Sequence, residues 1–122
     1  MISSRDSFGY NGNKRHFKFP YKRLYTRLLA SAARKNQEVS LTYEEFLKFT
    51  KEKHCYYCNA PLEWVKHGKK ANKYNLDRLN PNKGYHKNNV APCCWTCNNL
   101  KSATREGKFL AHIKRICDNL DL

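Results

Sequence analysis

Four cysteines stand in two pairs whose spacing is typical of a metal site. Cys55-Tyr-Tyr-Cys58 and Cys94-Trp-Thr-Cys97 each place two thiols close together, with residues 59–93 between the pairs. Such a turn directs both sulfurs to one side, and four thiolates form a tetrahedral ligand set for Zn²⁺. The spacing therefore predicts one structural zinc ion bound by Cys55, Cys58, Cys94 and Cys97. The alternative is a set of four buried free thiols.

Two oxygen-bearing side chains accompany the cysteine pairs. Asp77 stands near the end of an expected strand, and Asn98 directly follows Cys97 at the start of an expected helix. Carboxylate and amide oxygens are the ligands of a hard ion such as Mg²⁺ or Mn²⁺. Such an ion can neutralise the phosphate and the departing oxygen in phosphodiester cleavage. Asp77 and Asn98 are therefore candidate ligands of a catalytic divalent ion; the alternatives are a turn carboxylate and a helix N-cap.

The chain is strongly basic, with 24 Lys and Arg against 10 Asp and Glu and a formal net charge of +14 over 122 residues. This excess predicts a polyanionic partner, either a nucleic acid or an acidic membrane surface. No apolar stretch approaches the roughly 20 residues that span a bilayer, and no signal-peptide pattern is present. We therefore expect no membrane partner and an intracellular protein, where thiols stay reduced and favour metal binding.

Composition and periodicity divide the chain into three segments: a basic flexible arm over 1–19, a basic helix over 20–40 and a zinc-stabilised domain over 41–122. Aromatic residues in the arm suit contact with nucleic acid or cover the core. Pro20 suits the first position of the helix, because it has no N–H to leave unpaired. One face of that helix is basic, which predicts either DNA contact or a solvated surface. The DNA-contacting candidates are Arg23, Arg27 and Arg34.

The third segment alternates short helices and strands, which predicts an α+β fold. Thr42-Tyr-Glu-Glu45 forms a capping-box pattern that opens a helix running to about Lys53. Strands are expected over 74–79 and 89–92, and a helix from about Cys94 to Ser102. A last helix follows Thr104 and carries an apolar stripe that we expect in the core. The stripe consists of Phe109, Ile113, Ile116 and Leu120.

In order and spacing, these residues resemble the HNH endonucleases, specifically the small zinc-stapled members common in phage genomes. The match runs from about Leu41 to the C-terminus and carries the two cysteine pairs, Leu76-Asp-Arg-Leu79, Gly84-Tyr85 and Asn89-Val90. The resemblance implies a ββα-metal motif, in which two strands and a helix surround one divalent ion. It implies metal-dependent hydrolysis of phosphodiester bonds in DNA, with a structural Zn²⁺ and a catalytic Mg²⁺ or Mn²⁺. One site nicks one strand, so a double-strand cut needs two sites, as in a homodimer, or two successive events.

The resemblance also assigns roles within the site. It implies that Asp77 and Asn98 hold the catalytic ion and that Asn89 fixes a loop by hydrogen bonds. Arg78 stands where the family usually has the general-base His. A guanidinium cannot accept a proton but can grip a phosphate with two N–H groups. His86 is the leading substitute base, with Tyr85, Tyr74, His54 and His67 as rivals.

Two basic residues follow Asn98 on the helical side of the motif. Lys101 and Arg105 are candidates for binding flanking phosphates, or they are ordinary helix-end charges.

Arg78 also favours a rival interpretation, a non-catalytic zinc-ribbon nucleic-acid-binding protein, whereas the Asp77 and Asn98 pair favours the nuclease. An RNA nuclease would share the chemistry. If a phage encodes the chain, we expect it in the cytoplasm of the host cell.

Overall fold

The computed structural model describes residues 18–66 and 74–122. Nearly all of the predicted arm and the whole segment 67–73, with the rival base His67, lie outside the described residues. The described part contains the helices α2 (Lys22–Arg34), α3 (Tyr43–Phe49), α4 (Trp95–Lys101) and α5 (Glu106–Leu120), and the strands β2 (Leu76–Arg78) and β3 (Val90–Pro92). The α+β class is therefore confirmed. No helix in the described ranges is long and apolar enough to cross a membrane.

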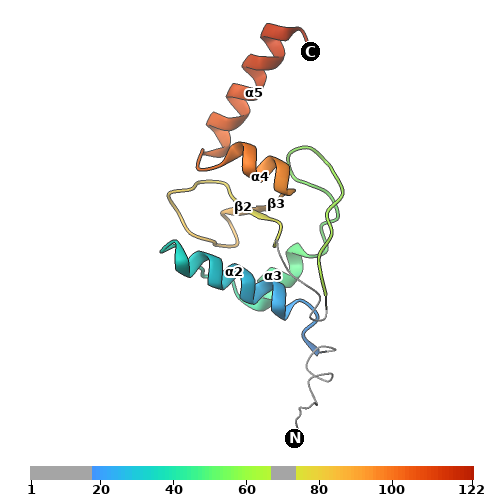
Figure 1. Ribbon diagram of the computed structural model, residues 1–122, viewed down its shortest axis with the longest axis vertical. Helices are drawn as coiled ribbons and strands as arrows, with labels where there is room; N and C mark the ends of the chain where they lie inside the picture. The colour runs from blue at the N-terminus through green and yellow to red at the C-terminus, as the bar shows by residue number, and fades with distance from the viewer. Residues whose placement is uncertain (1–17, 67–73) are drawn as a thin grey trace, which may run out of the picture.

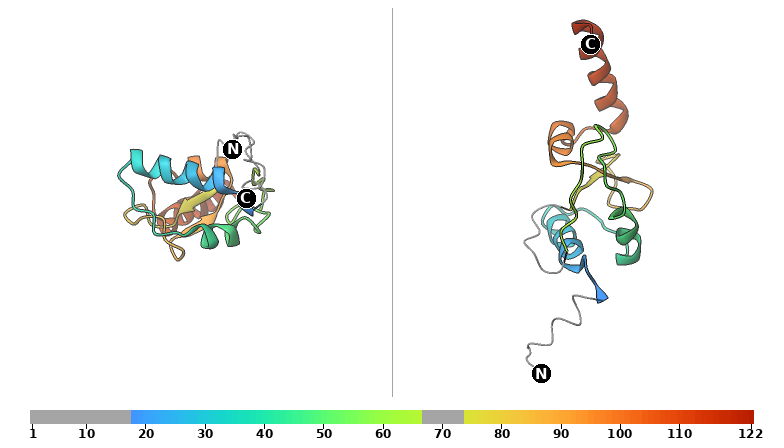
Figure 2. Two further views of the ribbon diagram at one scale, coloured as in Figure 1. Left: turned by 90° about the horizontal axis from the view of Figure 1, so that it is seen from below. Right: turned by 90° about the vertical axis from the view of Figure 1, so that its right-hand side faces the viewer.

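The two strands form an antiparallel hairpin between two helical layers. Leu76 pairs with Pro92, Asp77 with Ala91 and Arg78 with Val90. In Figure 1 the hairpin lies between α2 and α3 on one side and α4 on the other, and the side view of Figure 2 shows the same order. Side chains alternate across a strand, so Leu76 joins the core beside α2 and α3, while Asp77 faces the layer of α4.

The core side of the fold is built by α2 and α3. Leu24 and Leu28 of α2 are fully buried and pack with Phe46 of α3. The predicted capping box at the start of α3 is confirmed: the Glu45 N–H donates to Thr42 Oγ1 at 3.1 Å, and the Thr42 N–H donates to Glu45 Oε1 at 2.9 Å. The helix ends at Phe49 rather than near Lys53 as predicted, and there the Thr50 hydroxyl donates to Leu47 O at 2.6 Å.

Gly84 lets the hairpin loop dock closely on the connector between α2 and α3. The Tyr85 N–H donates to Glu38 O at 2.7 Å, and the Ser40 N–H donates to Tyr85 O at 3.1 Å. A Cβ at position 84 would lie 2.3 Å from the same Glu38 oxygen. Only glycine therefore permits this approach of two backbones.

The last helix differs from its prediction. Its apolar stripe was expected in the core, yet α5 has no buried residue, and Ile113, Ile116 and Leu120 are 39%, 41% and 59% exposed. That expectation is wrong because, within the described residues, the contacts that attach α5 lie at its first turn: the Glu106 N–H donates to Leu79 O at 2.9 Å, and Phe109 packs on Tyr57. Figures 1 and 2 show the later turns extending away from the other elements.

Candidate metal centre and the adjoining polar site

The four predicted zinc ligands meet in one cluster. The sulfurs of Cys55, Cys58, Cys94 and Cys97 all lie within 4.8 Å of one another, and the Cys58 and Cys94 sulfurs are 3.7 Å apart. Zn–S bonds of about 2.3 Å in a tetrahedron require sulfur separations of roughly 3.8 Å. The cluster could therefore hold a metal ion such as zinc.

Backbone N–H groups point at these sulfurs and favour thiolates. The Tyr57 N–H donates to Cys55 Sγ and the Cys97 N–H to Cys94 Sγ, each at 3.4 Å. Burial acts to raise the pKa of Cys55, but N–H groups around its sulfur outweigh burial and lower this pKa to about 6. Burial raises the pKa of Cys94 and Cys97 instead. Cys94 is also the N-cap of α4, so the second cysteine turn starts the helix that carries Asn98.

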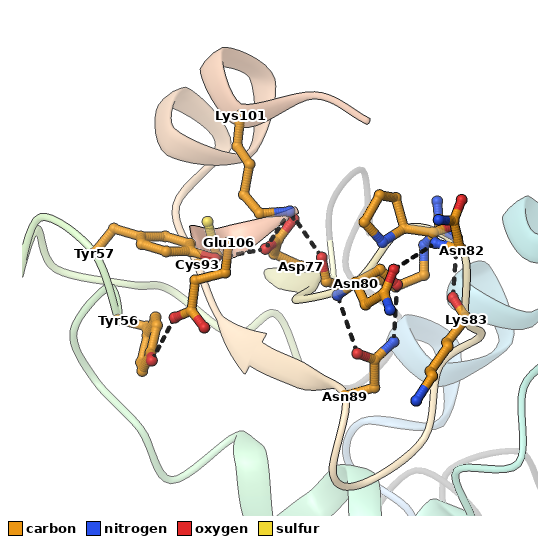
Figure 3. A network of polar contacts seen from close by, with 12 residues as sticks. Tyr56, Tyr57, Asp77, Asn80, Asn82, Lys83, Asn89, Cys93, Lys101 and Glu106 are labelled. Carbon is orange, nitrogen blue, oxygen red and sulfur yellow. Dashed lines mark hydrogen bonds and ion pairs between the residues drawn. The ribbon is translucent and has the colours of Figure 1, made fainter. Parts of the chain in front are cut away.

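Asp77 is buried beside this cluster and has two side-chain partners. Its side chain is 3% exposed; Tyr57 Oη donates to its Oδ2 at 2.9 Å, and Lys101 Nζ lies 3.3 Å from Oδ2 and 3.4 Å from Oδ1. Figure 3 shows Tyr57 and Lys101 reaching the carboxylate from two different directions. Burial raises the pKa of Asp77, against the effects of Tyr57 and Lys101.

Lys101 lies inside the protein rather than at the surface where a phosphate contact was expected. Its side chain is 0% exposed, and its ammonium also donates to Arg78 O at 2.8 Å. The ammonium therefore contacts both carboxylate oxygens of Asp77 and a main-chain oxygen of β2. These contacts join the last turn of α4 to the strand.

Asn98 occupies the fourth position of α4, and Cys94 rather than Asn98 is the N-cap. Residues three apart share one helix face, so Asn98 lies on the face of α4 that Lys101 turns toward β2. Its side chain is half-buried, and within the described residues its amide has no hydrogen-bond partner. Among the described residues, this amide is therefore unbound on the face of α4 that turns toward β2.

Arg78 is engaged by its own loop. Its Nη1 donates to Pro81 O at 2.6 Å and to Lys83 O at 3.1 Å, and its guanidinium lies 5.5 Å from the centre of the Tyr85 ring. Asn89 fixes the same loop: its side chain binds the N–H and C=O of Asn80 and the C=O of Gly84. Figure 3 shows the Asn89 contacts with Asn80.

His86 lies at the connector between α2 and α3. Its Nδ1 is 2.5 Å from Ser40 Oγ, and its Nε2 is 3.6 Å from Glu38 Oε1. Among the described residues, no contact joins His86 to Asp77. The structure thus brings Asp77 and Lys101 together, with Asn98 on the facing helix, while the imidazole of His86 is bound elsewhere.

The predicted nucleic-acid contacts lie at the surface. Arg23, Arg27 and Arg34 are exposed on α2, and Arg105 is exposed as the N-cap of α5. Lys101 is the exception in this set, since it is buried.

Tyr57 is the site residue that the sequence reasoning missed. It stands inside the first cysteine turn and reaches Asp77 across the space between the turn and β2. Its neighbour Tyr56 donates to Glu106 Oε2 at 2.6 Å and so attaches α5 to the same turn. Two adjacent tyrosines between the predicted zinc ligands were the available signal, but their hydrogen-bond partners depend on how distant segments meet.

Comparison with known proteins gives one relative of unknown activity. The chain is similar to an uncharacterized protein of Acanthamoeba polyphaga mimivirus, with 34% identity over 86 residues. The similarity covers 70% of this chain but 15% of the viral protein, so the chain spans a small part of its relative. No protein-family model matches the chain, and no solved structure matches it.

Proposed function

We propose that this chain is a metal-dependent endonuclease of the HNH type that hydrolyses phosphodiester bonds in DNA and nicks one strand per site. One observation carries the proposal: a buried carboxylate, Asp77 on β2, faces the helix that carries Asn98 and accepts a hydrogen bond from Tyr57 in the first turn of the four-cysteine cluster. A binding module has no need of oxygen ligands at that place. The order hairpin, cysteine turn and helix also agrees with the ββα-metal motif that the sequence resembles.

The donor set suits a hard cation. Asp77 offers carboxylate oxygens, Asn98 an amide oxygen, and the Arg78 carbonyl already accepts from an ammonium group. Such oxygens are what Mg²⁺ or Mn²⁺ binds. When bound by Asp77 and Asn98, the ion would neutralise charge on the scissile phosphate and on the leaving oxygen. The cysteine cluster would hold a separate structural Zn²⁺ and keep α4 in position.

The remaining residues have supporting roles. Asn89 and Arg78 hold the loop between the strands, so Arg78 would meet a phosphate only with the N–H groups that the loop carbonyls leave free. His86 remains the candidate general base to be tested. In this structure its ring nitrogens contact Ser40 and Glu38. Tyr57 is a poor base, because burial and the Asp77 carboxylate raise its pKa above the ordinary tyrosine value.

DNA is the proposed partner because of charge and placement. The formal net charge is +14, and the exposed arginines of α2, together with Arg105, offer phosphate contacts. A double-strand cut would come from a homodimer or from two successive nicks.

A second candidate function is a non-catalytic zinc-dependent nucleic-acid-binding protein. The ion pair between Lys101 and Asp77 favours it, since the pair already neutralises the carboxylate. The contacts of Arg78 with Pro81 and Lys83 favour it too, since they give this residue a structural role.

Plasmid nicking separates the two functions. Supercoiled plasmid is incubated with zinc-loaded protein and Mg²⁺ or Mn²⁺, using the wild type, Asp77→Ala, Asn98→Ala and the control Asn99→Ala. Asn99 is exposed on the same helix, so the control changes the same residue type outside the site. The nuclease proposal expects nicking by the wild type and Asn99→Ala alone. DNA binding by the wild type without nicking under either ion would leave the binding-protein function.

A further inference from the structure

We propose that the Lys101 ammonium is the resident cation of the Asp77 site, and that a divalent ion binds Asp77 only by displacing it. Three oxygens surround this ammonium: both carboxylate oxygens of Asp77, at 3.3 and 3.4 Å, and Arg78 O at 2.8 Å. The side chain that supplies it is 0% exposed. Lys101 would therefore lower the affinity of the site for a divalent ion.

The same oxygens are needed by both cations. A carboxylate has about four lone-pair positions; at Asp77 one accepts the Tyr57 hydroxyl and others face Lys101. A divalent ion must come much closer to the oxygens, at about 2.1 Å for Mg²⁺. Two positive charges cannot share these oxygens in a buried place without strong repulsion. Binding of the ion therefore requires the ammonium to leave.

The position of Lys101 in the helix allows such a movement. Lys101 is the last residue of α4, and the C-cap Ser102 has a left-handed φ of 51°. The next two residues, Ser102 and Ala103, are exposed, so solvent is close to the end of the helix. A flexible four-carbon stem can swing the ammonium outward from there without moving α4.

The first experiment measures ion affinity. Mn²⁺ is titrated into zinc-loaded wild type, Lys101→Met and the control Lys108→Met, by calorimetry or by the electron spin resonance of free Mn²⁺. Lys108 is exposed on α5, so its variant loses the same charge without touching Asp77. We expect Lys101→Met to bind Mn²⁺ at least about tenfold more tightly than both other proteins, and Asp77→Asn to lose the site. Equal or weaker binding by a folded Lys101→Met would overturn the proposal.

A second experiment needs no variant and decides the matter if Lys101→Met does not fold. Lysines of the zinc-loaded wild type are acetylated briefly with and without Mg²⁺, and each site is quantified by mass spectrometry, with Lys108 as internal reference. We expect Lys101 to be protected without Mg²⁺ and to react severalfold faster with saturating Mg²⁺. Unchanged protection of Lys101 at saturating Mg²⁺ would show that the ammonium stays in place.

The inference rests on the ion site of the proposed nuclease, but the two can fail separately. If Lys101→Met gains Mn²⁺ affinity while no protein nicks DNA, Lys101 is the resident cation of a site without nuclease activity. If the wild type nicks DNA while Lys101→Met binds Mn²⁺ no more tightly, the nuclease stands and the displacement is rejected.

Discussion

The hydroxyl of Tyr57 donates to Oδ2 of Asp77 at 2.9 Å and so joins the first cysteine turn to strand β2. The bond reaches a carboxylate that is 3% exposed. The first cysteine turn and the polar site are therefore joined by a direct hydrogen bond between Tyr57 and Asp77.

Removal of this bond should destabilise the fold measurably. Tyr57→Phe keeps the ring contact with Phe109 but removes the hydroxyl that donates to the buried Asp77 carboxylate, which then keeps only Lys101 as a side-chain partner. Hydrogen bonds to charged groups are worth about 1.5–3 kcal/mol, and we expect that loss in the free energy of unfolding, measured with urea on zinc-loaded protein. Tyr56→Phe is the control. The hydrogen bond from Tyr56 to Glu106 is exposed to solvent, so its removal should lower the free energy of unfolding by less than about 1 kcal/mol. Equal losses would show that burial of the Asp77 contact has no energetic weight.

The two described glycines give opposite expectations for the same substitution. Gly84→Ala places a Cβ 2.3 Å from Glu38 O, so the loop must leave the connector; we expect a loss of at least about 2 kcal/mol in unfolding free energy. Gly107 lies in the first turn of α5 with nothing within 4 Å of an added Cβ. Gly107→Ala should therefore stabilise by roughly 0.5–1 kcal/mol. Both changes in unfolding free energy are measured by urea denaturation. A Gly84→Ala variant as stable as the wild type would contradict the close contact between the hairpin loop and Glu38.

Zinc affinity should rise with pH. Burial raises the pKa of Cys94 and Cys97, so both thiols carry protons at pH 7 before the metal arrives and must release them on binding. Cys55, with a pKa lowered to about 6, is already largely ionised at that pH. Calorimetry in buffers of different ionisation enthalpy measures the protons released. We expect the affinity to increase from pH 6 to pH 8; an affinity independent of pH over this range would contradict these thiol states.

DNA affinity should depend steeply on salt, and the α2 face should contribute to that dependence. Each phosphate contact adds roughly −0.9 to the slope of log K against log salt. Arg27→Glu combined with Arg34→Glu should weaken binding and make the slope less steep, as measured by fluorescence anisotropy at several salt concentrations. Lys51→Glu changes an exposed lysine outside this face and serves as the control. The α2 surface is not a DNA contact if the double variant and the control behave alike.

The parts of the fold that sequence could predict are those fixed within a few residues. The cysteine turns and the capping box of Thr42 and Glu45 depend on spacing along the chain, and the structure has them as expected. The partner of Lys101 depends on the placement of α4 against β2, which no local pattern encodes. The apolar stripe of α5 reports an amphipathic helix but not what covers it, and for that reason its burial was predicted incorrectly.

The ion pair between Asp77 and Lys101 should behave as one energetic unit. Asp77→Asn leaves the Lys101 ammonium buried without its charge partner. Lys101→Met likewise leaves the Asp77 carboxylate buried without a positive charge beside it. Each change should therefore cost about 3–5 kcal/mol in unfolding free energy without added divalent ions. The double variant removes both charges, and its cost should be lower than the sum of the single costs by about 1–3 kcal/mol. The exposed pair of Lys114 and Asp118, at 3.0 Å on α5, is the matched control, and its coupling should be about 0.3–0.5 kcal/mol. Additive costs at Asp77 and Lys101 would mean that the two side chains do not interact in solution.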